Sequence, residues 1–484
     1  MRYSDLSEWS LRIGRWAAQY HDTLRARPVR AQTAPGDILR EIPAHAPTNP
    51  TPVDIVFADF EKLIPDAMTH WQHPRFFAYF PANAAPASIL AEQIINTMAC
   101  NCMLWQTSPA ATELEQRMVE WLRGAVGLPD RFTGTIQDSA TTATLCAILT
   151  MRERSLDWQG LSHGLTGQDV IRIYASPENH SSIIKAARIS GIGDANLVQV
   201  ATDSQLAMCP RRLRQAIEQD LAAGMRPAGL VLCAGGTANG AFDRIADTIA
   251  VAKEFGLYCH VDAAWAGAAM ICPEFRYLWK GAESADSIVI NPTKWLGAQF
   301  DCSVQLLTEP ELQSRTLSLR PEYLQSGNQN GMTDFQDLTI PLGRRFRALK
   351  LWFVFRVYGV SGLQGMIRNH VNWVKALENK LIADPEFEIV TSCPLALFTF
   401  RYAPKGGDAD SLTTRLLNNI NDDGRIYLTP SQFKGRPVIR MTAGTFSCAE
   451  SDVMSVYDIV RELASEITST ADTTQQRSDI PKPV

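Results

Sequence analysis

Helical patterns alternate with short apolar runs from about residue 88 to residue 305, and this alternation constrains the fold more than any other feature of the chain. It predicts an α/β fold with a mainly parallel sheet that helices cover on both faces. Ligands bind such sheets at the carboxyl ends of the strands, so reactive side chains are expected there. The expected strands are residues 169–175, 228–234, 257–262 and 287–291, and helical patterns between them include 211–223 and 245–255.

The segments on either side of this region have different patterns. Residues 5–25 place apolar side chains three and four positions apart, which predicts an amphipathic helix. A proline-rich arm over 27–52 leads to a second expected helix at 53–67, and residues 340–380 have the pattern of a long helix. Beyond it, strands are expected at 387–391, 396–401 and 438–442, and helices at 409–422 and 451–468.

These patterns predict four parts of the chain. The first is an N-terminal helical arm (residues 1–87), which is expected either to wrap around a second copy of the chain or to cover its own domain. A large domain (88–380) carries the sheet and any cofactor, and a small α+β domain follows (381–470). The polar, proline-ended tail (471–484) is expected to be disordered.

The composition of the chain excludes several classes of protein. It has 484 residues, of which 45% are apolar and 20% charged, with a net charge of −5, as expected for a globular protein in water. Basic stripes for nucleic acid, polybasic helices and long apolar runs for membranes are missing. The ten cysteines form no C-x-x-C pair, the eight histidines lack metal-binding spacing, and the N-terminus lacks a signal-peptide pattern. A cytosolic protein without a metal is expected.

A lysine follows directly after the last expected strand of the sheet region. The run Ser-Ile-Val-Ile-Asn-Pro-Thr-Lys-Trp ends with Lys294 in a turn, where an enclosed amine is expected. Burial lowers the pKa of a lysine, and the neutral amine can form an imine with a carbonyl group. The alternative is an ordinary lysine whose amine reaches the solvent.

An aspartate ends the preceding strand. Asp262 stands in the run His-Val-Asp-Ala-Ala, where an apolar strand is followed by small residues. A carboxylate at that depth needs a cationic partner, and a protonated pyridine nitrogen is one candidate. The alternative is a carboxylate that caps the next helix.

A run of hydroxyl-bearing and small residues precedes another helical pattern. Residues 137–144 read Gln-Asp-Ser-Ala-Thr-Thr-Ala-Thr, and a helix N-terminus of this kind attracts a phosphate. The alternative is simple helix capping by Ser139 or Thr141. A phosphate site, then Asp262, then Lys294 32 residues later is the order found in fold-type-I enzymes that use pyridoxal phosphate (PLP).

Over residues 5–465 the sequence resembles the group II PLP-dependent decarboxylases, and within them the aromatic-L-amino-acid decarboxylases and aromatic aldehyde synthases. The resemblance implies the aminotransferase-like fold, with a seven-stranded, mainly parallel sheet. It also implies a homodimer with active sites at the interface. The motifs are Trp-Gln-His-Pro-Arg-Phe-Phe-Ala-Tyr-Phe-Pro (71–81), Trp-Gln-Thr-Ser-Pro (105–109), His-Ser-Ser (180–182), His-Val-Asp-Ala-Ala (260–264), Asn-Pro-Thr-Lys-Trp (291–295) and Ile-Pro-Leu-Gly-Arg-Arg-Phe-Arg (340–347).

The resemblance also implies roles for individual residues. Lys294 would carry PLP as an imine, Asp262 would pair with the pyridine nitrogen, and His180 would stack on the ring. The implied cofactor-binding residues are Ser139, Ala140, Thr141, His180, Thr237, Asp262, Asn291, Thr293 and Lys294. The implied substrate pocket consists of Trp71, Tyr79, Phe80, Pro81 and Met103, the last from the partner chain. The alternatives are a surface or capping histidine at 180 and a plain apolar core at 71–81.

The sequence departs from the decarboxylase pattern at one catalytic position. Decarboxylases of this family have Asp-Tyr-x-x-Trp before the Ile-Pro-Leu-Gly segment, and that tyrosine protonates the α-carbon. This chain has Phe335 there, as aromatic aldehyde synthases do, and those enzymes consume O₂ and release an aldehyde, ammonia and peroxide. Alternatively, Phe335 is a packing residue, and Tyr323, His180 or water supplies the proton.

Smaller departures affect the pocket and the cofactor site. Thr293 stands where the family has histidine, and Ala82 and Asn101 change the polarity of the pocket. The run Gly235-Gly236-Thr237-Ala238-Asn239 replaces a threonine-rich turn, although Thr237 aligns with it. The expected reaction is therefore decarboxylation of phenylalanine, tyrosine, tryptophan or dopa, with the aldehyde synthase reaction as the alternative. An aminotransferase would share Lys294 and Asp262, whereas a glutamate decarboxylase needs a basic pocket. A scaffold without activity would not need either of those residues.

Overall fold

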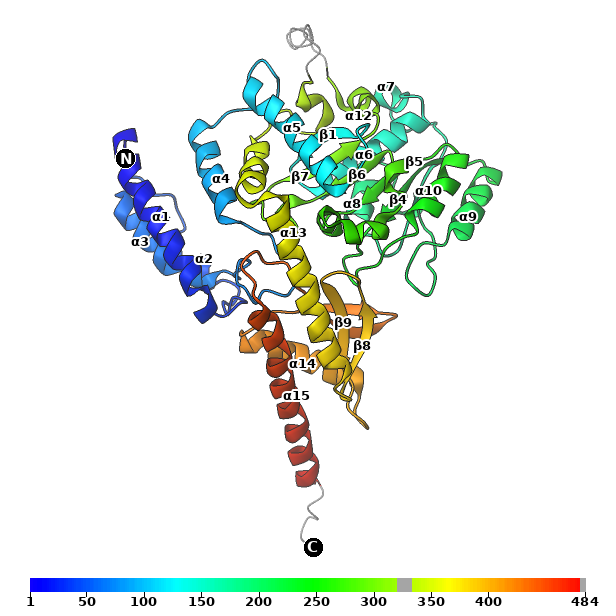
Figure 1. Cartoon of the computed structure of the whole chain (residues 1–484). Coiled ribbons are helices and arrows are strands. Elements are labelled where there is room, and N and C mark those ends of the chain that lie inside the picture. Colours follow the sequence, from blue (N-terminus) through cyan, green and yellow to red (C-terminus); the bar gives the residue numbers. More distant parts are fainter. Residues whose placement is uncertain (320–332, 479–484) are drawn as a thin grey trace. The chain divides into compact units, whose positions relative to one another are not determined.

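The computed structural model describes residues 1–319 and 333–478 (Figure 1), with the side chains after residue 467 left undescribed. The chain divides into two compact units, which we treat separately. The sheet unit comprises Ala82–Asn369 and Cys393–Leu395. The terminal unit comprises Met1–Pro81, His370–Ser392 and Ala396–Val484, so it is built from both ends of the chain.

A seven-stranded sheet forms the centre of the sheet unit. Its order is β1-β7-β6-β5-β4-β2-β3; the five strands from β6 to β3 are parallel, and β7 is antiparallel to both of its neighbours. The expected α/β class with a mainly parallel sheet is therefore confirmed. The strands are β1 (Thr133–Gln137), β2 (Ile171–Ala175), β3 (Leu197–Gln199), β4 (Arg226–Cys233), β5 (Tyr258–Asp262), β6 (Ser287–Ile290) and β7 (Ser303–Leu307).

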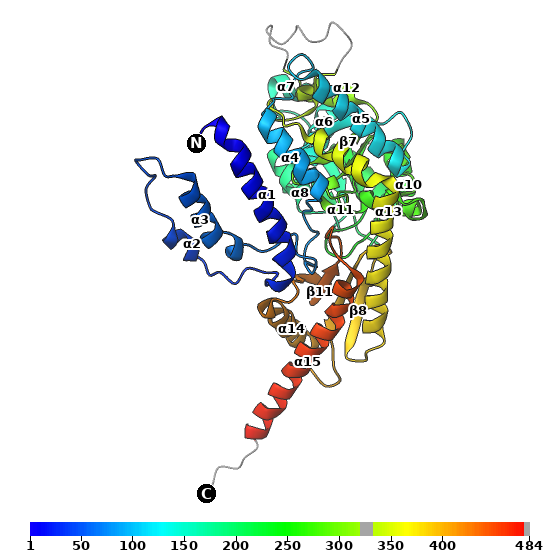
Figure 2. The ribbon, with the colours of Figure 1, turned by 60° about the vertical axis from the view of Figure 1, so that its left-hand side comes forward.

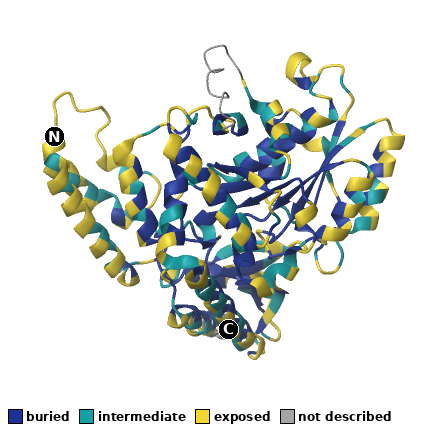
Figure 3. Ribbon diagram, turned by 45° about the horizontal axis from the view of Figure 1, so that its top comes forward, coloured by how far each residue is buried: buried dark blue, intermediate teal, exposed yellow. Residues whose placement is uncertain are grey.

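Helices cover this sheet on both faces. Every residue of β5, β6 and β7 is buried, which requires cover on each side of the strands (Figure 3). The helices of this unit are α4 (Pro86–Met98), α5 (Pro109–Val126), α6 (Ala140–Ser155), α7 (Gly160–His163), α8 (Ser182–Ile189), α9 (Pro210–Ala222), α10 (Ile245–Glu254), α11 (Pro292–Trp295) and α12 (Pro310–Leu317). The long helix α13 (Arg347–Ile382, interrupted at Gly359) belongs to this unit up to Asn369 and to the terminal unit from His370.

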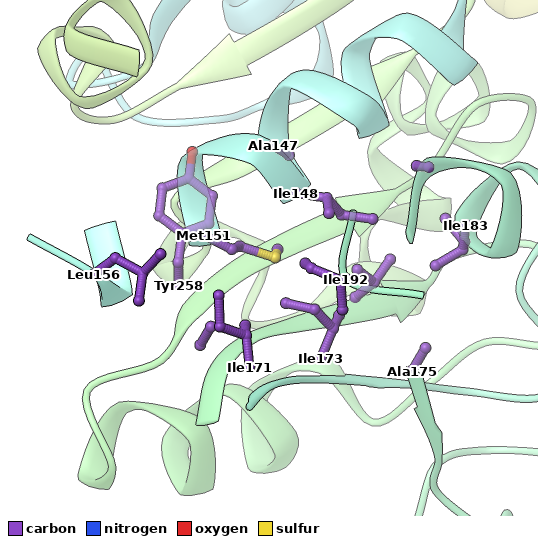
Figure 4. Packing of buried hydrophobic residues seen from close by; sticks show 13 residues of the cluster. Ala147, Ile148, Met151, Leu156, Ile171, Ile173, Ala175, Ile183, Ile192 and Tyr258 are labelled. Atoms are coloured by element: carbon purple, nitrogen blue, oxygen red, sulfur yellow. The ribbon is translucent and has the colours of Figure 1, made fainter. Parts of the chain in front are cut away.

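A cluster of apolar side chains fixes α6 to the sheet (Figure 4). Ile148 and Met151 of α6 pack with Ile171 and Ile173 of β2, and all four are at most 4% exposed. The approach is close, because a Cβ atom on Gly229 of β4 would lie 2.3 Å from the Met151 sulfur. This packing holds the N-terminus of α6 at one edge of the sheet.

The terminal unit contains a four-stranded antiparallel sheet with the order β10-β11-β9-β8. Helices α1 and α3 lie side by side in both views (Figures 1 and 2) and are joined by contacts such as Trp16 with Phe60. Its elements are α1 (Leu6–Thr23), α2 (Asp37–Glu41), α3 (Val53–Leu63), β8 (Phe387–Ser392), β9 (Leu397–Tyr402), α14 (Ala409–Asp423), β10 (Thr429–Phe433), β11 (Arg436–Thr442) and α15 (Glu450–Ser478).

The tail that was expected to be disordered begins inside α15. This helix continues through 471–478, and residues 479–484 lie outside the described residues. Over residues 1–319 and 333–478, no helix combines the length and the apolar character that a membrane span needs.

Four buried titratable groups make the stability of the chain depend on pH. Burial lowers the pKa of His73, His260 and His370 to about 4 and raises the pKa of Asp243 to about 7. Between about pH 4 and 6.5, the unfolded chain therefore binds three more protons at the histidines and one fewer at the aspartate. Each net proton changes the free energy of unfolding by about 1.4 kcal/mol per pH unit, so stability should fall by about 2.7 kcal/mol per unit on acidification.

Urea unfolding of the protein at several pH values between 4.5 and 7 measures this slope. The His260→Gln variant is the internal comparison, because it removes one titrating group and glutamine can still bond to Ser287, which lies 2.9 Å from Nδ1 of His260. Its slope should be shallower by one proton, and equal slopes in the two proteins would contradict the assignment.

Candidate active site

Five strands of the sheet unit end at the same edge. Strands β2, β4, β5 and β6 are parallel to one another, and β1 shares their direction because β7 is antiparallel to both β1 and β6. Gln137 at the end of β1 is level with Ser303, and Ile290 at the end of β6 is level with Val304. Asp262 is the last residue of one of these strands, and the residues that follow the others include Ser139, His180, Thr237 and Lys294. The topology thus brings together most of the residues expected to bind the cofactor.

Lys294 stands in the one-turn helix α11, directly after β6. Pro292 occupies the first turn and Trp295 is fully buried, while Lys294 is half-buried and Thr293 is 3% exposed. The Lys294 N–H donates to the Asn291 carbonyl at 3.0 Å, and the Asn291 N–H donates to the Ala264 carbonyl at 2.8 Å. The second bond ties the turn of Lys294 to the turn that follows Asp262.

Asp262 is the last residue of β5 and is 9% exposed. Its Oδ1 accepts a hydrogen bond of 3.1 Å from the Ala264 N–H, so the carboxylate caps the following turn and not a helix, as the alternative interpretation had it. Capping uses one carboxylate oxygen and is compatible with a cationic partner at the other. Burial lowers the pKa of His180, and the negative charge of Asp262 opposes this lowering.

His180 follows β2 and has an exposed ring whose Nδ1 is held in place. Nδ1 accepts a hydrogen bond of 3.2 Å from the Ser182 N–H and lies 2.9 Å from Ser182 Oγ. Partial burial lowers the pKa of His180 most strongly, and the charge of Lys294 lowers it further. The ring is therefore neutral at pH 7, with its proton on Nε2, and can lie flat against an aromatic cofactor.

The N-terminus of α6 provides an anion site at the same edge. The Ser139 hydroxyl accepts a 3.1 Å bond from the Thr142 N–H, so Ser139 caps the helix, as the alternative interpretation predicts. The first-turn N–H groups, including those of Ala140 and Thr141, have no partner within a helix. The buried Asn291 Oδ1 also lacks a hydrogen-bond partner among the described residues, and turning this amide would offer its NH₂ to a phosphate. These donors fit the phosphate of PLP.

Thr237 lies in an exposed part of the loop after β4, next to the loop of His180. Asn239 Nδ2 donates to Glu178 Oε2 at 2.6 Å, and the Cys233 thiol donates to the Glu178 carbonyl at 3.6 Å. Glu178 and Asn239 were not predicted as site residues. The hints in the sequence are the position of Glu178, two residues before the His-Ser-Ser motif, and the position of Asn239 in the turn that departs from the family pattern.

Met103 and Phe335 come together in the sheet unit. The Gln336 N–H donates to the Met103 carbonyl at 3.2 Å, and the Asp334 carboxylate accepts a 2.9 Å bond from the Trp105 N–H. Phe335 is 3% exposed and packs against Leu307 and Leu338. A cavity of about 820 Å³ opens beside Phe335 and is lined by none of the expected cofactor-binding residues. Tyr323, the alternative proton donor, lies outside the described residues.

The remaining residues of the expected pocket belong to the terminal unit. Trp71 and Tyr79 are exposed and stacked, with ring centroids 5.8 Å apart. Phe80 and Pro81 are buried, and a Cβ on Gly444 would lie 2.7 Å from the Phe80 ring. Phe80 therefore has a packing role, as the alternative interpretation predicts, whereas Trp71 and Tyr79 form an open aromatic surface.

Tyr427 extends this aromatic surface and was not predicted from the sequence. Its ring lies 6.1 Å from that of Tyr79, and burial raises its pKa to about 12. Tyr79 has a φ angle of 47°, which is unusual for a residue with a side chain, and its N–H donates to Thr429 Oγ1 at 2.6 Å. Arg440 binds the Tyr79 carbonyl. Strain of this kind is typical of ligand-binding positions.

In the part of the chain that the structure describes, no group of three or more histidine, cysteine, aspartate or glutamate side chains could hold a metal ion.

A model of the family described as "Pyridoxal-dependent decarboxylase conserved domain" matches residues 35–403. The aromatic-L-amino-acid decarboxylase of Rattus norvegicus is 37% identical over 466 residues, which cover 93% of this chain and 96% of the rat protein. Phenylacetaldehyde synthase of Arabidopsis thaliana is 36% identical over 478 residues, covering 96% of this chain and 97% of the plant protein.

The fold agrees with that of a solved relative. The crystal structure of Oryza sativa TDC with PLP and tryptamine superposes with a TM-score of 0.93 at 32% identity, covering 96% of this chain and 99% of the rice chain. The similar proteins thus include both decarboxylases and an aldehyde synthase.

Proposed function

Because the chain belongs to the pyridoxal-dependent decarboxylase family, we propose that it removes the α-carboxyl group of an aromatic L-amino acid and releases the arylalkylamine and CO₂. PLP is its cofactor. One observation carries the proposal: Asp262 ends β5, Lys294 follows β6 and His180 follows β2, so three parallel strands bring these residues to one edge of the sheet. We further propose that the enzyme works as a cytosolic homodimer.

Each of these three residues has a proposed task. PLP, when bound, provides a sink for the electron pair that remains after CO₂ departs. The Lys294 amine would hold the cofactor covalently and exchange with the amine of the substrate. The Asp262 carboxylate would keep a proton on the ring nitrogen, and the neutral His180 ring would cover one face of the cofactor.

The anion site at α6 would hold the phosphate group. The N–H groups of Ala140 and Thr141, the Ser139 hydroxyl and the Asn291 amide are suitable donors for its oxygens. Thr293 would add a hydroxyl, and Thr237 would lie near the ring substituents.

Trp71 and Tyr79 are the residues that we propose for recognition of the aromatic side chain. Their stacked, exposed rings offer an apolar surface, and such a surface discriminates poorly against one added hydroxyl group. Phenylalanine, tyrosine, tryptophan and dopa are therefore all candidate substrates. Met103 of a second copy would complete the pocket, with Phe80 and Pro81 supporting it from behind.

Phe335 favours a second candidate function, that of an aromatic aldehyde synthase. A phenyl ring cannot donate a proton to the α-carbon, and O₂ would then accept the electron pair instead. The overall reaction consumes the amino acid, O₂ and water, and yields an arylacetaldehyde, CO₂, ammonia and hydrogen peroxide. Against this candidate, Phe335 is packed into an apolar cluster of its own chain.

Product analysis distinguishes the two functions. The purified enzyme with added PLP is incubated in air with L-phenylalanine, L-tyrosine, L-tryptophan and L-dopa in turn, and amine, aldehyde and peroxide are quantified. We expect amine without peroxide. Equal amounts of aldehyde and peroxide would establish the second candidate, and neither product from any substrate would overturn the aromatic assignment.

The Phe335→Tyr variant tests whether this position sets the product. If Phe335 only packs, the variant should make the same amine at a similar rate, with stability lowered by about 1–3 kcal/mol for the buried hydroxyl. The Phe132→Tyr variant, at a fully buried position of the same unit, controls for that cost. A variant that replaces aldehyde and peroxide with amine would show that the parent enzyme is an aldehyde synthase.

A further inference from the structure

The short helix of Lys294 cannot satisfy its own carbonyl groups. Helix α11 has only four residues and ends before Gly297, whose φ angle is +83°. The N–H groups of Leu296 and Ala298 both donate to the Pro292 carbonyl. The carbonyls of Thr293 and Lys294 therefore need donors from another part of the chain, because buried carbonyl groups are costly without hydrogen bonds.

Asn83 provides both donors. Its N–H donates to the Thr293 carbonyl at 2.7 Å, and its side-chain Nδ2 donates to the Lys294 carbonyl. Asn83 is 1% exposed, so these bonds are shielded from water. One residue thus caps two consecutive peptide groups of the turn that carries the lysine.

The contact continues along the chain in the same direction. The Ala85 N–H donates to the Gly297 carbonyl at 2.9 Å, and the Gln299 N–H donates to Ser88 Oγ at 2.6 Å. Residues 83–88 therefore lie alongside residues 293–299. Within the first segment, Asn83 is the residue that forms a hydrogen bond with Lys294.

We propose that Asn83 is a positioning residue for Lys294. The Lys294 N–H is held by Asn291 on one side and the Lys294 carbonyl by Asn83 on the other, which fixes the direction of the Cα–Cβ bond. The Lys294 side chain can still rotate about its bonds, but the position and direction from which it extends are fixed, and this limits where its amine can lie. This inference rests on the proposed role of Lys294 as the residue that binds the cofactor, since displacements of about 1 Å lower the efficiency of such sites.

Two substitutions separate positioning from packing. Asn83→Asp keeps the shape of the side chain but sets a carboxylate oxygen against the Lys294 carbonyl, whereas Asn83→Ala only removes the donor. If Asn83 acts through its donor, the aspartate variant should be at least as impaired as the alanine variant. A packing role predicts the opposite order, because aspartate fills the space and alanine does not.

The expected effect is a roughly tenfold weaker affinity for PLP in the alanine variant, measured by titrating the apoenzyme with PLP and following visible absorbance. The rise in melting temperature on PLP addition should shrink in parallel, and kcat should fall more than KM rises. Asn421→Ala is the matched control, because Asn421 is a buried amide in the terminal unit that donates to the Leu428 carbonyl at 3.1 Å. It should lower the melting temperature without changing PLP affinity.

Unchanged PLP affinity in both Asn83 variants would overturn the inference, and so would a normal aspartate variant beside an impaired alanine variant. If one of the two Asn83 variants does not fold, the other is compared with Asn421→Ala. Weaker PLP affinity and a fall in kcat that exceeds the rise in KM, seen in the Asn83 variant alone, would support the inference, and equal values in both proteins would overturn it. Failure of the underlying assignment would be visible separately. Borohydride reduction of the parent enzyme would then attach PLP to a lysine other than Lys294.

Discussion

Replacing Lys294 with alanine is expected to abolish covalent attachment of PLP and to lower turnover by at least about 10³-fold. The reason is that Lys294 is the residue to which we assign imine formation with PLP. Among the described residues we place no other amine for this reaction at the carboxyl ends of β5 and β6. Borohydride reduction followed by peptide mass spectrometry measures attachment, and product formation measures turnover.

Lys185→Ala is a suitable control for this experiment. Lys185 is exposed on α8, the helix that begins two residues after His180, so it would be modified by any unspecific labelling near the site. Its replacement should change neither labelling nor turnover. Continued labelling of the Lys294→Ala enzyme at another lysine would refute the role of Lys294.

Replacing Asp262 with asparagine should lower kcat by about 10²–10³-fold while leaving the fold intact. Asparagine can still accept the hydrogen bond from the Ala264 N–H, so the turn stays capped. It cannot provide the negative charge that a protonated ring nitrogen needs. The loss of that charge should also lower the pKa of His180 further, because Asp262 raises it.

The matched control for this substitution is Asp286→Asn. Asp286 is a buried carboxylate beside the same strand, where it accepts a 2.6 Å bond from the Cys259 N–H and pairs with Lys253 at 2.6 Å. Its asparagine variant should be less stable but should keep its kcat. A drop in kcat of equal size in both variants would show that the effect of Asp262 is structural.

The parallel part of the sheet was predictable from the sequence because its signals are local. Strands β2, β4, β5 and β6 are apolar runs separated by helical patterns, and each was expected within a few residues of its observed bounds. Strands β1, β3 and β7 were not predicted. Strand β1 begins Thr133-Gly134 and depends on antiparallel pairing with β7, about 170 residues later in the chain. Its Gly134 has no room for a Cβ, which would lie 1.9 Å from the Gln305 carbonyl oxygen, and no local pattern reveals such a constraint.

The same distinction applies to the candidate site. Lys294, Asp262 and the α6 N-terminus could be proposed from the sequence. Each stands at or just after the end of a strand, and the residues next to it in the sequence indicate its chemistry. Asn83, Glu178 and Tyr427 could not be proposed in this way, because what distinguishes them are hydrogen bonds and ring contacts with distant segments. The family resemblance supplied the position of Phe335, but its burial against Leu307 became visible only in three dimensions.

Because the terminal unit is built from both ends of the chain, it cannot fold completely until synthesis is almost finished. The bond from the Tyr79 N–H to Thr429 joins residues that are 350 positions apart, and Val29 similarly bonds to Gly424. At ribosomal speeds of about 5–20 residues per second, the first 81 residues must wait on the order of 20–70 s for these partners. Meanwhile the parallel sheet can already assemble. Trp71 and Tyr79 are thus synthesised early, but the aromatic surface to which they belong is completed only when Tyr427 and Thr429 join it. By then the strands that carry the cofactor-binding residues have already been synthesised.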